Sequence, residues 1–180
     1  MHQLSGLALL ALAITVMPAR GQENAGNRWP ITDVVAPTTQ LALELYVNIA
    51  PRVEVGATDD GVRQFIPITG GHFSGDGIRG EVMSGGADWQ LRRPDGVVEV
   101  YALYSLRTDD GAVIVVDNRG IIAPAAASAG ATPAAAYVRT SPRFHAPQGK
   151  YDWLNKTVFI GTITPAPGGG AVIIRAFRVQ

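Results

Sequence analysis

The 180-residue sequence contains no cysteine. Disulfide bonds, a nucleophilic thiolate and cysteine-ligated metal sites are therefore excluded, and the folded chain has to be held together by its core. The sequence also lacks an excess of charge of either sign, because 15 Lys and Arg residues balance 15 Asp and Glu residues. Without a net positive field to gather phosphates, we expect no nucleic-acid partner.

Histidine is scarce, since only His72 and His145 follow residue 21. A catalytic zinc needs three protein ligands, and no carboxylates stand at ligand spacing beside these histidines. The sequence therefore predicts no metal site.

Long apolar runs are scarce too, and the clear one is residues 4–17. It is short for a membrane span and is followed by the small residues Ala19 and Gly21, which predicts a signal peptide over residues 1–21. We expect export to the periplasm or beyond, with no membrane anchor after cleavage; an uncleaved anchor is the alternative. Residues 22–40 are polar and proline-bearing and are predicted to form an N-terminal arm.

Amphipathic helical patterns are almost absent, whereas strand patterns and turns repeat from residue 41 to the C-terminus. The turn sequences RPDG at 93–96 and TDDG at 108–111 flank a predicted strand over 97–108. Further predicted strands include 41–49, 112–117, 137–145, 153–163 and 171–179. Roughly eight strands of even spacing favour an all-β domain over 41–180, a single antiparallel barrel whose interior can hold one small ligand.

Two features of this barrel stay open. The strand over 97–108 has one apolar face and one mixed face, so Tyr101 and Tyr104 point to opposite sides and only one of them can line a cavity. Residues 123–136 are rich in alanine but contain two prolines, and we expect a loop there. The loop is interpreted as a mobile lid or as a surface insertion.

Several motifs together resemble one protein family. They are ITGGHFSG at 68–75, GGADWQ at 85–90 with the RPDG and TDDG turns, RTSPRF at 139–144 and YDWLN at 151–155. The sequence from about Leu41 onward is identified by them as similar to the domain-of-unknown-function 3237 family, also called UPF0311. The resemblance implies a compact antiparallel barrel similar to the allene oxide cyclase and dirigent type, with no established cofactor.

The resemblance also implies an activity, because some members are associated with bacterial breakdown of lignin-derived aromatic dimers as lyases or decarboxylases on phenylcoumaran compounds. This sequence departs from the family pattern at two places. Members commonly have Asp-Ala-Arg-Tyr where residues 101–104 read YALY, and Phe-Glu where Phe144 and His145 stand. The departures imply a less charged pocket with a more aromatic ligand.

The candidate site residues are polar groups on the predicted strands, and each has a structural alternative. His145 suits proton transfer near neutral pH or is an exposed strand-end residue; His72 is a similar candidate in a glycine-flanked loop. Asp88 and Gln90 share a strand face, and a buried Asp88 carboxyl would have a raised pKa and act as an acid; alternatively it bonds backbone groups at the Gly85–Gly86 bend. Arg139 binds a substrate carboxylate or forms a surface ion pair.

The sequence therefore supports three hypotheses. In the first, a cofactor-independent lyase opens a phenylcoumaran ring and releases carbon dioxide, with His145 as base, Tyr101 or Asp88 as acid, and Arg139 orienting the carboxylate. Gln90, Leu103, Trp153 and Asn155 would complete its substrate-binding surface. In the second, the barrel is a periplasmic carrier of a small apolar or aromatic ligand. In the third, it is an assembly domain without a cavity. A homodimer is compatible with each of them.

Overall fold

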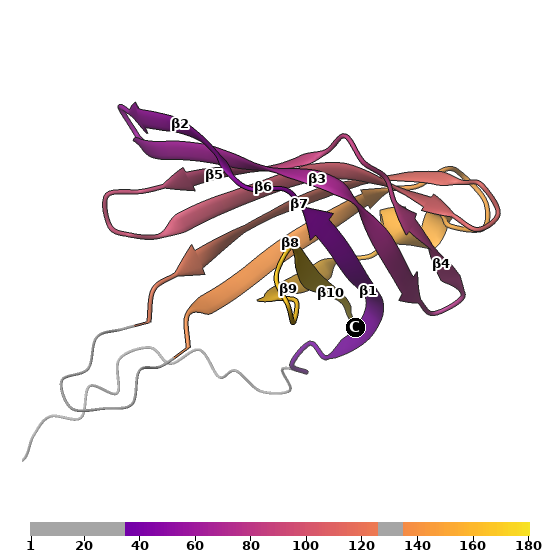
Figure 1. Cartoon of the computed structure of the whole chain (residues 1–180). Helices are drawn as coiled ribbons and strands as arrows, with labels where there is room; N and C mark the ends of the chain where they lie inside the picture. The colour runs from indigo at the N-terminus through magenta and orange to yellow at the C-terminus, as the bar shows by residue number, and fades with distance from the viewer. Residues whose placement is uncertain (1–34, 126–134) are drawn as a thin grey trace, which may run out of the picture. The chain divides into compact units, whose positions relative to one another are not determined.

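The computed structural model describes residues 35–125 and 135–180 (Figure 1). The predicted signal peptide, most of the predicted arm and most of the predicted 123–136 loop lie outside the described residues. Ten strands and one short 3-10 helix are found in the described chain: β1 (Thr39–Ile49), β2 (Val53–Thr58), β3 (Gly61–Gly75), β4 (Ile78–Val82), β5 (Ala87–Arg92), β6 (Val98–Thr108), β7 (Val113–Ala123), β8 (Tyr137–His145), η1 (Asp152–Lys156), β9 (Phe159–Pro165) and β10 (Ala171–Val179).

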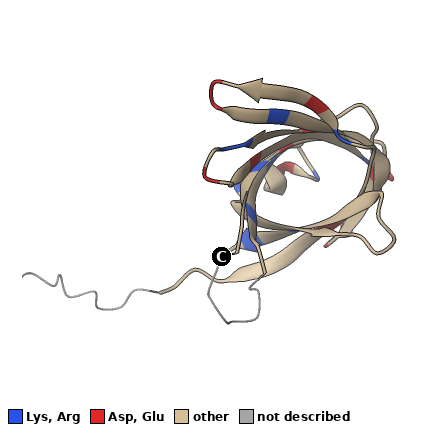
Figure 2. Ribbon diagram, turned by 60° about the vertical axis from the view of Figure 1, so that its left-hand side comes forward, with Lys and Arg blue, Asp and Glu red and all other residues tan. Residues whose placement is uncertain are grey.

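The strands close into an antiparallel barrel with eight positions around the ring (Figure 2). Closure occurs where β1 pairs with β10 on one side and with the second half of β3 on the other. The shorter strands β4 and β5 share one position, because β5 pairs with the first half of β3 and β4 with its second half, and both pair with β6. β2 pairs only with the first half of β3. The predicted eight-stranded barrel is confirmed.

Two local predictions differ from the structure. Residues 152–156 form the 3-10 helix η1 where a strand over 153–163 was expected, because the Asn155 side chain bonds both the N–H and the C=O of Ala146, at 2.8 and 3.0 Å. These bonds hold the segment curled against β8, and Leu154 is buried beneath it. In β1, a bulge between Leu41 and Leu43 turns Leu41 outward, where it is 47% exposed, although regular alternation over the predicted strand 41–49 would place it on the same face as the buried Leu43 and Leu45.

One end of the barrel is solid. The side chains buried there include Leu43, Leu45, Leu106, Ile114, Leu154 and Phe159. On β6 the apolar face, from Val98 to Leu106, points inward and the mixed face points outward, which settles the orientation that the sequence left open. Toward the start of β6 the inward residues become small, Val100 and Ala102, and the interior is no longer filled.

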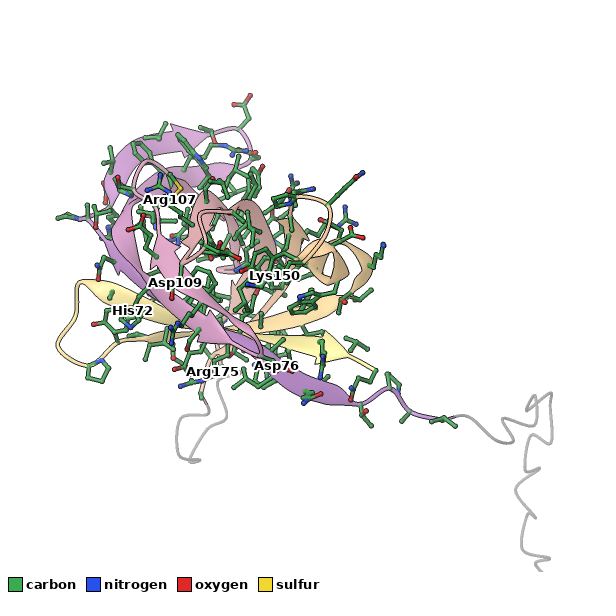
Figure 3. The ribbon with its side chains drawn as sticks, turned by 90° about the vertical axis from the view of Figure 1, so that its right-hand side faces the viewer. His72, Asp76, Arg107, Asp109, Lys150 and Arg175 are labelled. Carbon is green, nitrogen blue, oxygen red and sulfur yellow. The ribbon has the colours of Figure 1, made fainter. Side chains whose placement is uncertain are left out.

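A polar network closes the solid end. The Asp110 carboxylate, in the turn after β6, accepts hydrogen bonds from Lys150 and from the Tyr151 hydroxyl, both at 2.8 Å. Figure 3 labels Lys150 and Asp109 at this end of the molecule, where both line the same surface pocket. These donors hold the pKa of the Asp110 carboxyl well below its usual range. The network therefore fastens the β6–β7 turn to the segment before η1.

Within the described residues, no helix has the length and apolar character needed to cross a membrane.

Candidate functional site

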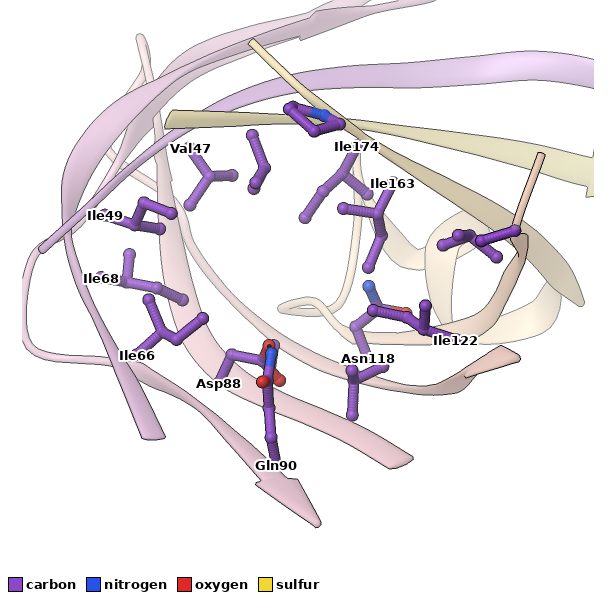
Figure 4. A pocket seen from close by; sticks show the side chains of 16 residues that line it. Val47, Ile49, Ile66, Ile68, Asp88, Gln90, Asn118, Ile122, Ile163 and Ile174 are labelled. Carbon is purple, nitrogen blue, oxygen red and sulfur yellow. Dashed lines mark hydrogen bonds between the residues drawn. The ribbon is translucent and has the colours of Figure 1, made fainter. Parts of the chain in front are cut away.

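The barrel encloses a cavity of about 430 Å³ at the end opposite the solid core. Its walls are formed by inward side chains of β1, β3 and β5 to β10, and most of these side chains are aliphatic (Figure 4). The largest of these side chains are Ile49, Ile66, Ile68, Ile122, Ile163 and Ile174. This volume lies within the ~300–1,000 Å³ that small-molecule sites usually have.

Three polar side chains interrupt the apolar wall: Asp88 and Gln90 on β5, and Asn118 on β7. Asp88 is held by a chain of hydrogen bonds. Gln64 Nε2 donates to Gln90 Oε1 at 2.6 Å, and Gln90 Nε2 donates to Asp88 Oδ2 at 2.6 Å. The backbone N–H of Tyr101 donates to the other carboxylate oxygen at 3.1 Å. The carboxyl is thus fixed in orientation within the cavity.

The surroundings of Asp88 shift its titration toward the protonated form. Burial raises the pKa of the Asp88 carboxyl, and the hydrogen bonds from Gln90 and from the Tyr101 backbone oppose this shift only in part. A carboxyl that retains its proton at higher pH than usual can donate it to a bound molecule. The same carboxyl lies near the buried Tyr104, whose pKa is raised by burial and by the negative charge of Asp88.

Of the residues predicted from the sequence, Asp88 and Gln90 line the cavity, whereas His145 and Arg139 do not. β8 alternates so that Thr140, Pro142 and Phe144 point inward, and His145 and Arg139 are therefore exposed on the outer surface. The Arg139 guanidinium donates to the Val138 carbonyl at 2.7 Å. The expected meeting of base, acid and guanidinium at one point is not found, because strand alternation separates them.

The other predicted residues of the strand pattern are also outside the cavity. Tyr101 and Leu103 lie on the outward face of β6, where the Arg119 guanidinium stacks over the Tyr101 ring at 4.1 Å. His72 is exposed and stacks on Tyr46 with ring centroids 5.2 Å apart. These contacts stabilise the outer surface of the sheet.

Trp153 and Asn155, which were expected to bind substrate, belong to η1. Trp153 packs against Phe159 with ring centroids 6.2 Å apart and covers the solid core. The Asn155 side chain is hydrogen-bonded to the backbone of Ala146 and to the carboxylate of Asp152. Both residues therefore have structural contacts at the end of the barrel away from the cavity.

The sequence interpretation missed Gln64 and Asn118, and it named Tyr104 only as the alternative to Tyr101 on the opposite strand face. Gln64 alternates with the inward residues Ile66 and Ile68, so its position was readable from the pattern of β3. Asn118 was missed because the predicted strand ended at Asp117, whereas β7 continues to Ala123. Extending the alternation of Ile114 and Val116 by one step places Asn118 inside.

Among residues 35–125 and 135–180, no group of three His, Asp or Glu side chains lies close enough together to hold a metal ion. Asp88, Gln90 and Asn118 are the polar side chains of the cavity lining that can face a polar part of an organic ligand.

The raised pKa of Asp88 predicts a pH-dependent stability difference for Asp88→Asn. Any stability that Asp88 contributes is complete below its unfolded-state pKa of about 3.9 and is lost as the pH rises through its raised pKa in the fold. Asn stays neutral, so the variant should gain stability relative to the unmodified protein between about pH 4 and pH 8. Urea unfolding of both proteins at both pH values measures this gain. The prediction is contradicted if the difference in free energy of unfolding between Asp88→Asn and the unmodified protein does not grow with pH.

Comparisons with known proteins agree with this architecture. The family model described as "Protein of unknown function (DUF3237)" matches residues 37–179. A UPF0311 protein of Rhodopseudomonas palustris (strain TIE-1) is 37% identical over 131 residues, which cover 69% of this chain and 86% of the relative. A UPF0311 protein of Clostridium acetobutylicum is 31% identical over 158 residues, which cover 83% of this chain and 99% of the relative.

Solved structures show the same barrel. A conserved Rhodopseudomonas palustris protein of unknown function aligns with a TM-score of 0.72 at 33% identity, over 82% of this chain and 100% of that chain. A β-barrel-like protein of Acinetobacter baumannii aligns with a TM-score of 0.72 at 30% identity, over 83% and 99%. An enzyme of Penicillium herquei shares the fold at 22% identity with a TM-score of 0.64, over 86% and 99%. Sequence and structure together therefore place this chain in the DUF3237 family, also called UPF0311.

Proposed function

We propose that the protein is a cofactor-independent lyase for small, neutral, largely apolar aromatic molecules, and that Asp88 is its proton donor. The observation that carries this proposal is the protonatable carboxyl of Asp88, held in a fixed orientation inside an apolar cavity of about 430 Å³. A site that only stored hydrocarbon would bury this carboxyl at a cost and gain nothing from it. An acid in a dry cavity, in contrast, suits proton transfer to a bound substrate.

The charge of the cavity selects the substrate. None of the described residues that line the cavity is Arg, Lys or His. A substrate carboxylate would therefore be desolvated beside Asp88 without a cation to pair with it, which is unfavourable. Arg139, the residue expected to bind such a carboxylate, lies on the outer surface. The cavity therefore suits the ring opening of phenylcoumaran-type compounds that carry no carboxylate, and decarboxylation is not part of the proposed reaction.

The proposed step opens a cyclic benzylic aryl ether. Asp88 gives its proton to the ether oxygen, the benzylic C–O bond breaks, and its electron pair stays on the oxygen, which becomes a phenol. A para-hydroxyl group on the other ring loses its proton to water at the cavity mouth, so the product is a neutral quinone methide. The Asp88 carboxylate then recovers a proton from solvent, and no oxidant or reductant is consumed.

Ala102→Phe tests whether this cavity is the site. Ala102 lines the cavity, and a phenyl ring there would occupy much of the space that the ligand needs. We expect affinity for a neutral phenylcoumaran alcohol, measured by calorimetry, to fall at least ~tenfold, with conversion followed by chromatography. The control is Leu103→Phe, which adds a ring of the same kind on the outward face of β6 and should leave the affinity unchanged.

The outcomes separate the candidate functions. Binding with conversion that Ala102→Phe removes supports the lyase. Binding that Ala102→Phe removes, without conversion of any aromatic ether offered, leaves a carrier of apolar ligands. Equal binding by both variants contradicts the cavity as the site.

A further inference from the structure

The inner wall of the barrel carries polar atoms that have no partner. In the described residues, the buried side-chain nitrogen and oxygen atoms without a hydrogen bond are Tyr104 OH, Asn118 Oδ1 and Thr140 Oγ1. Asn118 is only 1% exposed. A buried acceptor left unpaired costs free energy, so folded proteins rarely keep one unless a water molecule or a ligand completes it. Asn118 is the member of this set that lines the cavity.

Strand register places Asn118 opposite Asp88 across a single small residue. Ala102 on β6 pairs with Asp88 on β5 and with Asn118 on β7. The two polar side chains therefore stand at the same level of the barrel, two strand spacings or about 9–10 Å apart between Cα atoms, and both project into the cavity (Figure 4). No hydrogen bond joins them. The methyl group of Ala102 leaves the space between them open.

Tyr104 extends this arrangement toward the solid core. It follows Ala102 on the same inward face of β6, and its hydroxyl also lacks a partner in the described chain. Asp88, Asn118 and Tyr104 thus surround Ala102 on three sides, and apart from Gln90 the rest of the cavity wall is apolar. Polar groups gathered in this way bind a polar atom of the ligand rather than its hydrocarbon part.

We infer that the ligand places one hydroxyl oxygen over Ala102, between Asp88 and Asn118, and that the ligands of this protein bear or acquire a phenolic hydroxyl at their buried end. A neutral Asp88 carboxyl donates to this oxygen, and Asn118 Oδ1 accepts the hydroxyl proton. An ether or a ketone satisfies only the first of these bonds, because it has no proton to donate to Asn118. Asn118 is therefore a positioning residue that distinguishes phenols from their O-methylated forms.

This inference rests on the proposed function, since the oxygen over Ala102 is the one that Asp88 protonates when the ether ring opens. The hydrogen bond from this oxygen to Asn118 Oδ1 forms only after Asp88 has transferred its proton to the oxygen. Asn118 consequently favours the opened phenol over the closed ether.

A matched pair of probes tests the inference: 4-propylphenol and 4-propylanisole, which differ by one O-methyl group. By calorimetry, the unmodified protein should bind the phenol ~tenfold more tightly, the value of one net hydrogen bond inside a cavity. Asn118→Leu keeps the volume and removes the acceptor, so both probes should bind it equally. Thr140→Val removes another unpartnered buried oxygen that does not line the cavity, and should keep the tenfold preference.

The comparison in the unmodified protein keeps the test decisive even if Asn118→Leu does not fold. If the unmodified protein binds the two probes with equal affinity, the hydroxyl site is overturned. If Ala102→Phe then binds neither probe, the cavity is still the binding site. A preference for the phenol that persists in Asn118→Leu overturns the role of Asn118. Failure of both probes to bind overturns the inference together with the proposed function.

Discussion

Asp88→Asn should lower kcat/KM for ring opening by ~10²–10⁴-fold, the contribution of a positioned general acid. Asparagine has nearly the same shape and its Oδ1 can still accept the Tyr101 backbone N–H, but it has no acidic proton to give. Substrate affinity should change much less than the rate, because the apolar walls remain intact. Product formation followed by chromatography measures the rate, and far-ultraviolet circular dichroism verifies the fold.

Asp117→Asn is the matched control for this experiment. It removes the same charge from β7, but Asp117 is absent from the cavity lining and forms an ion pair with Arg119 at 3.0 Å. Its activity should stay within ~twofold of the unmodified protein, since exposed pairs contribute little. An Asp88→Asn variant that keeps more than a tenth of the activity would show that another group transfers the proton.

Gly71→Ala should open the barrel seam and lower the free energy of unfolding by about 3–5 kcal/mol. Gly71 lies in β3 between β1 and β4, pairing with Val47 and Val82, and has a φ of +136°. A Cβ atom at this position would stand 2.0 Å from the backbone oxygen of Tyr46, which cannot move without breaking the closure of the ring. Urea unfolding measures the loss.

Gly77→Ala is the control for the backbone effect alone. Gly77 also has a positive φ, +70°, but it lies in the turn between β3 and β4 with no atom within 4 Å of the added Cβ. Its cost should be about 1 kcal/mol, the usual penalty for a non-glycine residue in this conformation. If both substitutions lowered the free energy of unfolding equally, the close approach of β1 to β3 would not be the reason that position 71 requires glycine.

The barrel was predictable because its determinants are local. The RPDG and TDDG turns stand at the ends of β6. The alternation of apolar and polar residues along β1 and β6 can be seen in the sequence alone, and it indicates half-buried strands. The position of η1 was not predictable in this way. It depends on hydrogen bonds between Asn155 and Ala146, nine residues apart, which a pattern of apolar residues does not reveal.

The site was predictable only in part, because alternation separates two faces without saying which one points inward. For Asp88 and Gln90 the inward assignment was right. On β8, the face with Arg139 and His145 was assigned to the cavity for its chemistry, although charged side chains on a strand favour solvent. The actual inward face of β8 carries Thr140, Pro142 and Phe144. On β8, the preference of apolar side chains for the interior therefore predicts the inward face better than the chemistry of Arg139 and His145 does.

A crystal structure with a bound phenol is the most direct test of the central claim that this cavity is the functional site. We expect the ring among the isoleucine side chains of the cavity, with its oxygen over Ala102 and within hydrogen-bond distance of Asp88. A phenol ordered instead on the outer face of the sheet, beside Tyr101 and Arg119, with the cavity free of ligand, would contradict it.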